Sequence, residues 1–381
     1  ITYGTSNVAA GDGIAIAMGI SGRGRSFIGN TNEDANNDAS NFVVWTEGGG
    51  VLQEKLRIKG DGSIITTTPG SNNTRIGLSA GVNLASGSFR NTLIGDYAGE
   101  DITTGDYNIG VGYQSLTQLT TGERNTALGY QALRSLTSTA AAYNVAIGFA
   151  AGELMTTGAY NTLVGSLSGD AVTTGANNTA LGYISLSQAT TGSSNVALGY
   201  SALTATTTAS NNTAIGTQAG GQNTTGANNV AVGKDALYSN TTASGNTALG
   251  FEAGKDIVTG TGLTATGYKA AENTTGNNNS AFGYNVMQVN TSGSQNSAFG
   301  AFALDANSSG GENSAFGYQA LSANTTADNN TAFGYTALRD NTTGTSNTAF
   351  GVNTLRLATT ANNNTALGAF VLDVNTSGAQ N

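Results

Sequence analysis

A 17-residue repeat constrains the fold of this chain more than any other feature of its sequence. Its signature is the pentad Asn-(Thr/Val/Ser)-Ala-(Leu/Ile/Val/Phe)-Gly, seen clearly at Asn195-Val-Ala-Leu-Gly199. Counted from Asn73, eighteen repeats follow one another, and the spacing departs from this period at only three places. Self-similarity at one fixed period predicts a solenoid or array in place of several globular domains.

Each repeat divides into an alternating half and a polar half. The pentad alternates and is rich in β-branched residues, so it predicts a short strand. A Thr-Thr-Gly-x-Asn segment, such as residues 224–228, predicts a turn. A second short strand is expected around positions 8 and 9 of the repeat, for example at Ala132 and Leu133. One repeat then forms one coil, and eighteen coils stacked at the strand spacing of about 4.8 Å give a rod of roughly 86 Å.

Residues 1–72 differ from the repeats that occupy residues 73–381. They contain the only Trp, the only Pro and a large share of the charged residues. Two strands are expected at 41–46 and 51–58, joined by the glycine run 48–50, with a further turn at 59–63. Pro69-Gly70 marks the junction with the repeats. We interpret residues 1–72 as a small β-rich adaptor that caps the solenoid at 73–381.

Composition argues against most catalytic and binding chemistries. The chain has no Cys and no His, and its formal net charge is -9. These features disfavour thiolate catalysis, the commonest general base, metal sites and nucleic-acid binding. No apolar run approaches the ~20 residues that span a bilayer. We therefore expect no enzyme activity, no cofactor, no metal and no membrane insertion. A polysaccharide-degrading tailspike is the remote alternative, and it would need two carboxylates a few ångströms apart.

Alternation within the pentad assigns side chains to two faces. We place the second and fourth positions inside the coil, because the second is typically Thr, Val or Ser and the fourth is typically Leu, Ile, Val or Phe. The predicted core ladder at the fourth position includes Leu128, Ile147, Leu181, Leu198, Phe282, Phe299, Phe316, Phe333 and Phe350. The third position then faces outward, and its methyl groups would allow another chain to approach closely. The predicted trimer seam is the alanine row of Ala127, Ala146, Ala180, Ala197, Ala214, Ala231, Ala281 and Ala298. A thin coil is the alternative explanation of the same row.

Two other positions recur with one residue type. The first pentad position is nearly always Asn, which predicts a ladder of stacked amides. The sixth is often Tyr, as at Tyr130 and Tyr200, and these rows either pack structurally or contact a ligand. Asn-x-Thr triplets such as Asn223-Thr-Thr225 match the glycosylation pattern, but the repeat itself generates them.

The pentads Asn144-Val-Ala-Ile-Gly148 and Asn195-Val-Ala-Leu-Gly199 resemble the head repeats of trimeric autotransporter adhesins, and similar repeats occur in bacteriophage tail fibres. The resemblance implies a left-handed parallel β-roll, three chains about one axis, and a virion or extracellular location. The 17-residue period is longer than that of the adhesin heads, which favours the phage branch. The resemblance thus predicts a homotrimeric tail-fibre shaft whose receptor- or glycan-binding tip lies outside this chain. A bacterial surface adhesin or an extracellular filament subunit is the alternative.

Overall fold

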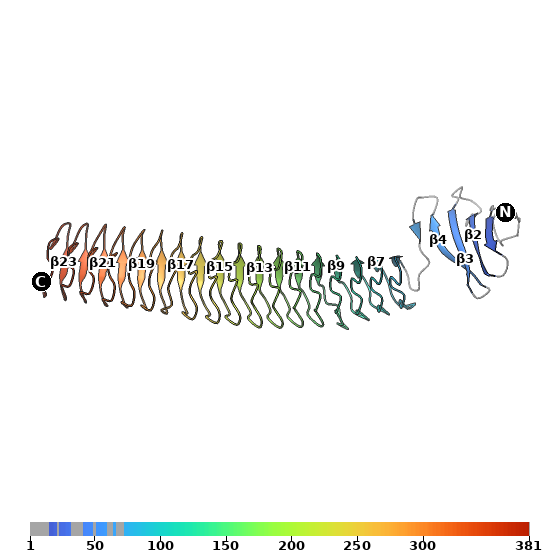
Figure 1. Ribbon diagram of the computed structural model, residues 1–381, viewed down its shortest axis with the longest axis horizontal. Coiled ribbons are helices and arrows are strands. Elements are labelled where there is room, and N and C mark those ends of the chain that lie inside the picture. Colours follow the sequence, from blue (N-terminus) through green and yellow to red (C-terminus); the bar gives the residue numbers. More distant parts are fainter. Residues whose placement is uncertain are drawn as a thin grey trace.

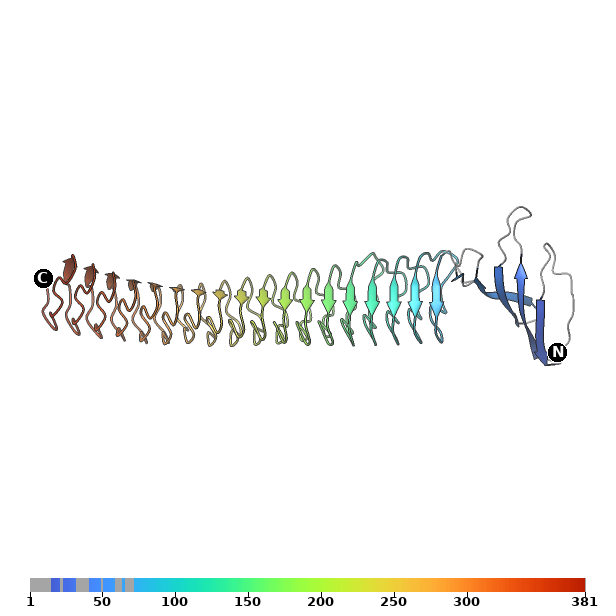
Figure 2. The ribbon, with the colours of Figure 1, turned by 90° about the horizontal axis from the view of Figure 1, so that it is seen from above.

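The computed structural model describes residues 15–20, 23–31, 41–48, 51–58, 64–65 and 72–380. Within these residues all regular structure is β, and the chain forms a long rod with a separate small sheet at one end (Figure 1). The view turned by 90° shows the same narrow rod, so the molecule is elongated in both projections (Figure 2).

The small sheet has five antiparallel strands in sequence order: β1 (Ala15–Ile20), β2 (Arg23–Thr31), β3 (Asn41–Gly48), β4 (Val51–Ile58) and β5 (Ile64–Ile65). Strands β3 and β4 pair directly, which confirms the two strands predicted there. The turn predicted at 59–63 and the Pro69-Gly70 junction lie outside the described residues. The division at residue 72 and the adaptor role stay predictions.

The rod contains eighteen strands, one at each pentad, and each is three residues long. Those of the first half are β6 (Thr74–Ile76), β7 (Thr92–Ile94), β8 (Ile109–Val111), β9 (Thr126–Leu128), β10 (Val145–Ile147), β11 (Thr162–Val164), β12 (Thr179–Leu181), β13 (Val196–Leu198) and β14 (Thr213–Ile215). Those of the second half are β15 (Val230–Val232), β16 (Thr247–Leu249), β17 (Thr264–Thr266), β18 (Ser280–Phe282), β19 (Ser297–Phe299), β20 (Ser314–Phe316), β21 (Thr331–Phe333), β22 (Thr348–Phe350) and β23 (Thr365–Leu367).

Each of these strands pairs in parallel with the strand of the next coil. The register places equivalent positions side by side, as in Val196 with Thr213, Ala197 with Ala214 and Leu198 with Ile215. The ladder runs without interruption from β6 to β23, which lie at opposite ends of the rod (Figure 1). The predicted parallel β-solenoid with one coil per repeat is therefore confirmed.

Across residues 72–380 the remainder of each coil is built from tight turns and contains no second strand. After the pentad, backbone N–H groups bond to carbonyls three residues earlier, as in Ala132 to Gly129 and Leu136 to Leu133. Positions 7, 9 and 17 adopt positive φ even where the residue is not glycine, for example 56° at Gln131 and 49° at Leu133. A left-handed residue cannot continue a strand. The second strand predicted at positions 8 and 9 is therefore wrong.

The assignment of the two strand faces is also wrong, because the structure reverses inside and outside. The middle residue of each strand from β7 onward is buried, and the predicted seam alanines are 0–2% exposed within this single chain. The predicted core ladder lies on the outer face, where Phe333 is 47% exposed and Leu128 43%. An alanine row that the chain itself covers cannot form a seam between chains.

The reversal has a volumetric cause. The turns bring the side chains of positions 8, 9 and 12 into the interior, so the coil has room for only a methyl group at position 3. Leucine occupies position 3 at Leu93 and Leu163, and both coils have glycine at position 9 (Gly99 and Gly169). A Cβ added at Gly169 would lie 2.8 Å from Leu163 Cδ2, so the leucine fills the space that glycine leaves. Close packing thus couples positions 3 and 9.

Candidate functional site: stacked columns along the rod

Because equivalent residues stack coil on coil, each repeat position forms a column parallel to the rod axis. The first column consists of the pentad asparagines, which are buried. Each Asn Oδ1 accepts a hydrogen bond from the backbone N–H of the next coil's first residue, at 2.9–3.2 Å. Most of the Nδ2 groups donate to a carbonyl in the turn that ends their own coil, as Asn178 does to Gly192. The predicted amide ladder is confirmed, and it satisfies polar groups on the interior side of the strand.

Position 12 forms a second internal column that changes character along the rod. Toward the N-terminus it is apolar, as at Leu119, Leu136 and Met155. In the second half it becomes a row of buried asparagines linked Nδ2 to Oδ1 at 2.8–3.2 Å, from Asn290 through Asn307 and Asn324 to Asn341. Asn341 Oδ1 is buried and has no partner, and the next residue of the column is Ala358. An amide row therefore ends with an unsatisfied oxygen where it meets an apolar residue.

We expect Ala358→Asn to stabilise the solenoid. The new Nδ2 group would donate to Asn341 Oδ1, and the column would continue to Asn375, the next position-12 residue. Satisfying a buried acceptor is worth about 1 kcal/mol. The midpoint of urea denaturation should rise relative to the parent protein. Ala337→Asn, which places the same amide at buried position 8 of a neighbouring coil, should lower the midpoint. A lower midpoint for Ala358→Asn as well would contradict this interpretation of the column.

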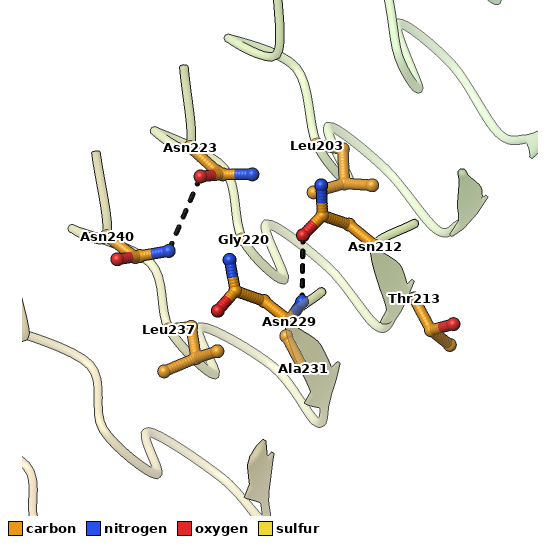
Figure 3. A pocket seen from close by; sticks show the side chains of 9 residues that line it. All are labelled: Leu203, Asn212, Thr213, Gly220, Asn223, Asn229, Ala231, Leu237 and Asn240. Carbon is orange, nitrogen blue, oxygen red and sulfur yellow. Dashed lines mark hydrogen bonds between the residues drawn. The ribbon is translucent and has the colours of Figure 1, made fainter. Parts of the chain in front are cut away.

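A small cavity lies where Gly220 occupies position 9, between Leu203 and Leu237 (Figure 3). Asn223 and Asn240 line it, joined by a hydrogen bond from Nδ2 of Asn240 to Oδ1 of Asn223 at 3.4 Å. The cavity has a volume of about 10 Å³. That is close to the least space that holds one water, so this cavity does not suit an organic ligand.

Aromatic residues at position 6 form exposed stacks on the outside of the coil. Tyr113 stacks on Tyr130 at a centroid distance of 5.3 Å, and Tyr130 stacks on Phe149 at 5.1 Å. A second stack joins Phe251, Tyr268 and Tyr284 in the same way. The rings stack on the equivalent rings of adjacent coils, so the ring faces are covered and the edges point to solvent. This arrangement stabilises neighbouring coils, and it leaves few free faces for stacking on a sugar.

Position 17 carries an alternating stack of arginine and tyrosine in the first coils. The guanidinium of Arg124 lies 5.2 Å from the ring centroid of Tyr107 and 5.5 Å from that of Tyr143. The guanidinium of Arg90 lies 5.3 Å from the centroid of the same Tyr107 ring. Arg124 also pairs with Glu123 at 2.7 Å. These contacts are cation–π and ion-pair interactions, and they account for both guanidinium groups without a ligand.

The most extensive ion-pair cluster surrounds Lys269. Its Nζ lies 3.0 Å from carboxylate oxygens of both Glu252 and Glu272, and Glu252 also pairs with Lys255. The hydrogen bond from Lys269 lowers the pKa of Glu252, and the pKa of Lys269 is raised by its two glutamates. The pair of Lys269 with Glu252 thus links two neighbouring coils electrostatically.

Two aspartates at position 10 have a raised pKa because they are partly buried. Burial raises the pKa of Asp170, and the neighbouring Glu153, which pairs with Arg134 at 2.8 Å, adds to the effect. Burial raises the pKa of Asp305 to about 6. In each of them Oδ1 is buried without a hydrogen-bond partner. The first aspartate follows β11 and the second follows β19, so many coils separate the two carboxylates.

We expect Asp305→Asn to stabilise the protein at pH 7 but not at pH 4. A carboxyl whose pKa is raised on folding binds its proton more tightly in the folded state. Its contribution to the free energy of unfolding is therefore full below about pH 4 and is lost as the pH rises to about 6. Because the side chain is partly exposed, the gain at pH 7 should be only about 1 kcal/mol. The midpoints of urea denaturation of the variant and the parent at pH 4 and pH 7 measure this gain. An equal shift of the midpoint at both pH values would contradict the burial explanation.

No group of three or more acidic side chains among the described residues has the geometry to hold a metal ion. The part of the chain that the structure describes also has no helix long and apolar enough to cross a membrane. No family model matches the chain, and no curated protein or solved structure matches it either.

Proposed function

We propose that this chain is a segment of an elongated structural or adhesive fibre, and specifically a piece of the shaft of a phage tail fibre used in host attachment. The observation that supports this most is the uninterrupted parallel ladder of eighteen coils, from β6 to β23. Such a stack holds its two ends a fixed distance apart, about 80 Å by the strand spacing, as a shaft must. A bacterial surface adhesin or an extracellular filament would use the same property.

The finer features of the proposal come from the repeat's resemblance to fibre and adhesin heads. They are a left-handed coil, a homotrimer with its three chains about one axis, an adaptor role for residues 1–72, and a receptor- or glycan-binding tip outside this chain. A trimer also has a physical reason. Each coil encloses little apolar volume, so three chains packed together would bury more apolar surface than one chain alone.

Immunogold electron microscopy tests the proposal. Antibodies raised against the solenoid should label fibres that project from a virion or from the surface of the producing cell. Uniform labelling of the cell interior would overturn the fibre proposal. The tailspike alternative is tested by incubating the protein with host surface polysaccharide. Release of reducing ends that is abolished in Asp170→Asn would establish an enzyme.

A further inference from the structure

The outer face of the solenoid's sheet is uncharged along its whole length, with large apolar side chains at one position of nearly every strand and mostly Thr or Ser at the other. We define the outer strip as the side chains at positions 2 and 4 of strands β6 to β23, which flank the inward-facing middle residue of each strand. Position 2 is Thr, Val, Ile or Ser, and position 4 is Ile, Val, Leu or Phe, with Thr266 as the one exception. Not one of these thirty-six side chains is charged, in a protein whose net charge is -9.

Large apolar side chains on this strip are exposed to solvent. In the strip Leu181 is 49% exposed and Leu249 48%. From β18 to β22 position 4 is Phe throughout, and adjacent rings lie 4.6–5.6 Å apart in nearly parallel stacks. A monomer seldom exposes a continuous apolar patch of more than a few hundred Å², and a larger one marks an interface.

The dimensions of the strip match those of a stable interface. Eighteen strands at about 4.8 Å spacing give a length of about 80 Å, and one three-residue strand with its side chains is about 10 Å wide. The resulting face of about 800 Å² per chain is what one partner contributes to a standard protein–protein interface.

We infer that the outer strip is the face by which copies of this chain associate along their length. A second copy is the partner that presents the same repeat spacing, the same length and no charged group that would have to be desolvated. This inference rests on the proposed fibre, and it places the contact on the opposite strand face from the buried alanine row. The Phe stack from Phe282 to Phe350 then lies in the contact, and aromatic residues including Phe are enriched in protein interfaces.

The test compares two triple variants with equally exposed apolar positions. The strip variant is Leu128→Glu, Leu181→Glu and Leu249→Glu, at positions 43–49% exposed. The control is Leu154→Glu, Val258→Glu and Val289→Glu, at positions 42–46% exposed that lie outside the strip. Neither set removes a buried side chain, and circular dichroism checks that both variants fold. Light scattering coupled to size exclusion measures the mass of each and of the parent, whose monomer is 38.1 kDa.

The parent and the control should have two or three times the monomer mass, whereas the strip variant should fall to the monomer mass. A monomeric parent, or a strip variant that stays assembled, would overturn the inference. Electron microscopy of the same samples keeps the two proposals apart. A monomer that is still a straight rod would refute the strip contact and the homotrimer but not the elongated fibre, whereas a particle that is not elongated would refute the fibre itself.

Discussion

Gly199→Ala is expected to destabilise the solenoid by about 4 kcal/mol or more, because the fifth position of the pentad has no room for a side chain. Gly199 has a φ of +134°, and a Cβ there would lie 2.5 Å from the carbonyl oxygen of Gly216 in the next coil. That carbonyl belongs to the backbone, so it cannot move aside as a flexible side chain would. In most coils the equivalent glycine stands against the glycine of the next coil in the same way.

Thermal unfolding followed by circular dichroism measures this effect, and the midpoint should fall by about 10 °C or more. Gly87→Ala is the matched control, because a Cβ at Gly87 would meet nothing within 4 Å and its φ is not in the left-handed range. The control should leave the midpoint within about 2 °C of the parent. Equal shifts for the two variants would show that coil-to-coil contact at the glycine column does not limit stability.

Asn178→Ala is expected to have the second largest effect, a loss of about 3–5 kcal/mol. The substitution leaves two buried backbone groups without partners: the carbonyl of Gly192, which now accepts from Asn178 Nδ2 at 2.9 Å, and the N–H of Asn195, which donates to Asn178 Oδ1 at 3.0 Å. The neighbouring Asn177 is exposed and has a φ of 58°. Asn177→Gly keeps that conformation without strain, so it should be nearly neutral.

Asn178→Asp separates hydrogen bonding from packing. A protonated aspartate can donate and accept as the amide does, whereas the ionised form places a negative charge against the Gly192 carbonyl. Because burial raises the pKa of a carboxyl, Asn178→Asp should be nearly as stable as the parent at low pH and should lose stability as the pH rises. Urea midpoints between pH 4 and pH 8 measure this. A flat pH profile would show that the ladder acts through shape alone.

Much of the fold could be predicted from the sequence. The 17-residue period identified the solenoid, the pentad identified its strand, and the recurrent first-position Asn identified the amide ladder. Each of these three predictions depends only on the local residue pattern and on the stacking of equivalent residues in successive repeats. The strands predicted at 41–46 and 51–58 followed from turn chemistry in the same way.

The assignment of faces failed because alternation shows only that positions 2 and 4 lie opposite position 3. It does not show which side is inside. Hydrophobicity suggested the large residues, but the interior is filled by Leu and Asn from positions 9 and 12, which enter from the turns. A signal was present in the sequence: Leu93 and Leu163 replace alanine at position 3 only in coils where position 9 is glycine. Such volume compensation occurs inside a core and not across an open surface.

The left-handed residues could not be foreseen either. Leu133 and Leu203 adopt φ near +50°, a conformation that side chains other than Gly and Asn seldom take. The burial of leucine in the core and the hydrogen bonds of the tight turns that follow the pentad outweigh this local strain. Tertiary packing therefore decided the conformation at position 9 against the strand predicted there.

Deletion of whole coils tests most directly that one repeat is one layer of the rod. Removing residues 178–245 takes out four whole repeats and joins Asn177 to Asn246 in phase. Electron microscopy should show a folded rod that is shorter by about 19 Å and unchanged in width. Removing residues 178–237 instead joins Asn177 to Tyr238, which breaks the phase and should disrupt the stack at the join. A rod of unchanged length after the in-phase deletion, or equal tolerance of both deletions, would contradict the one-repeat, one-coil structure.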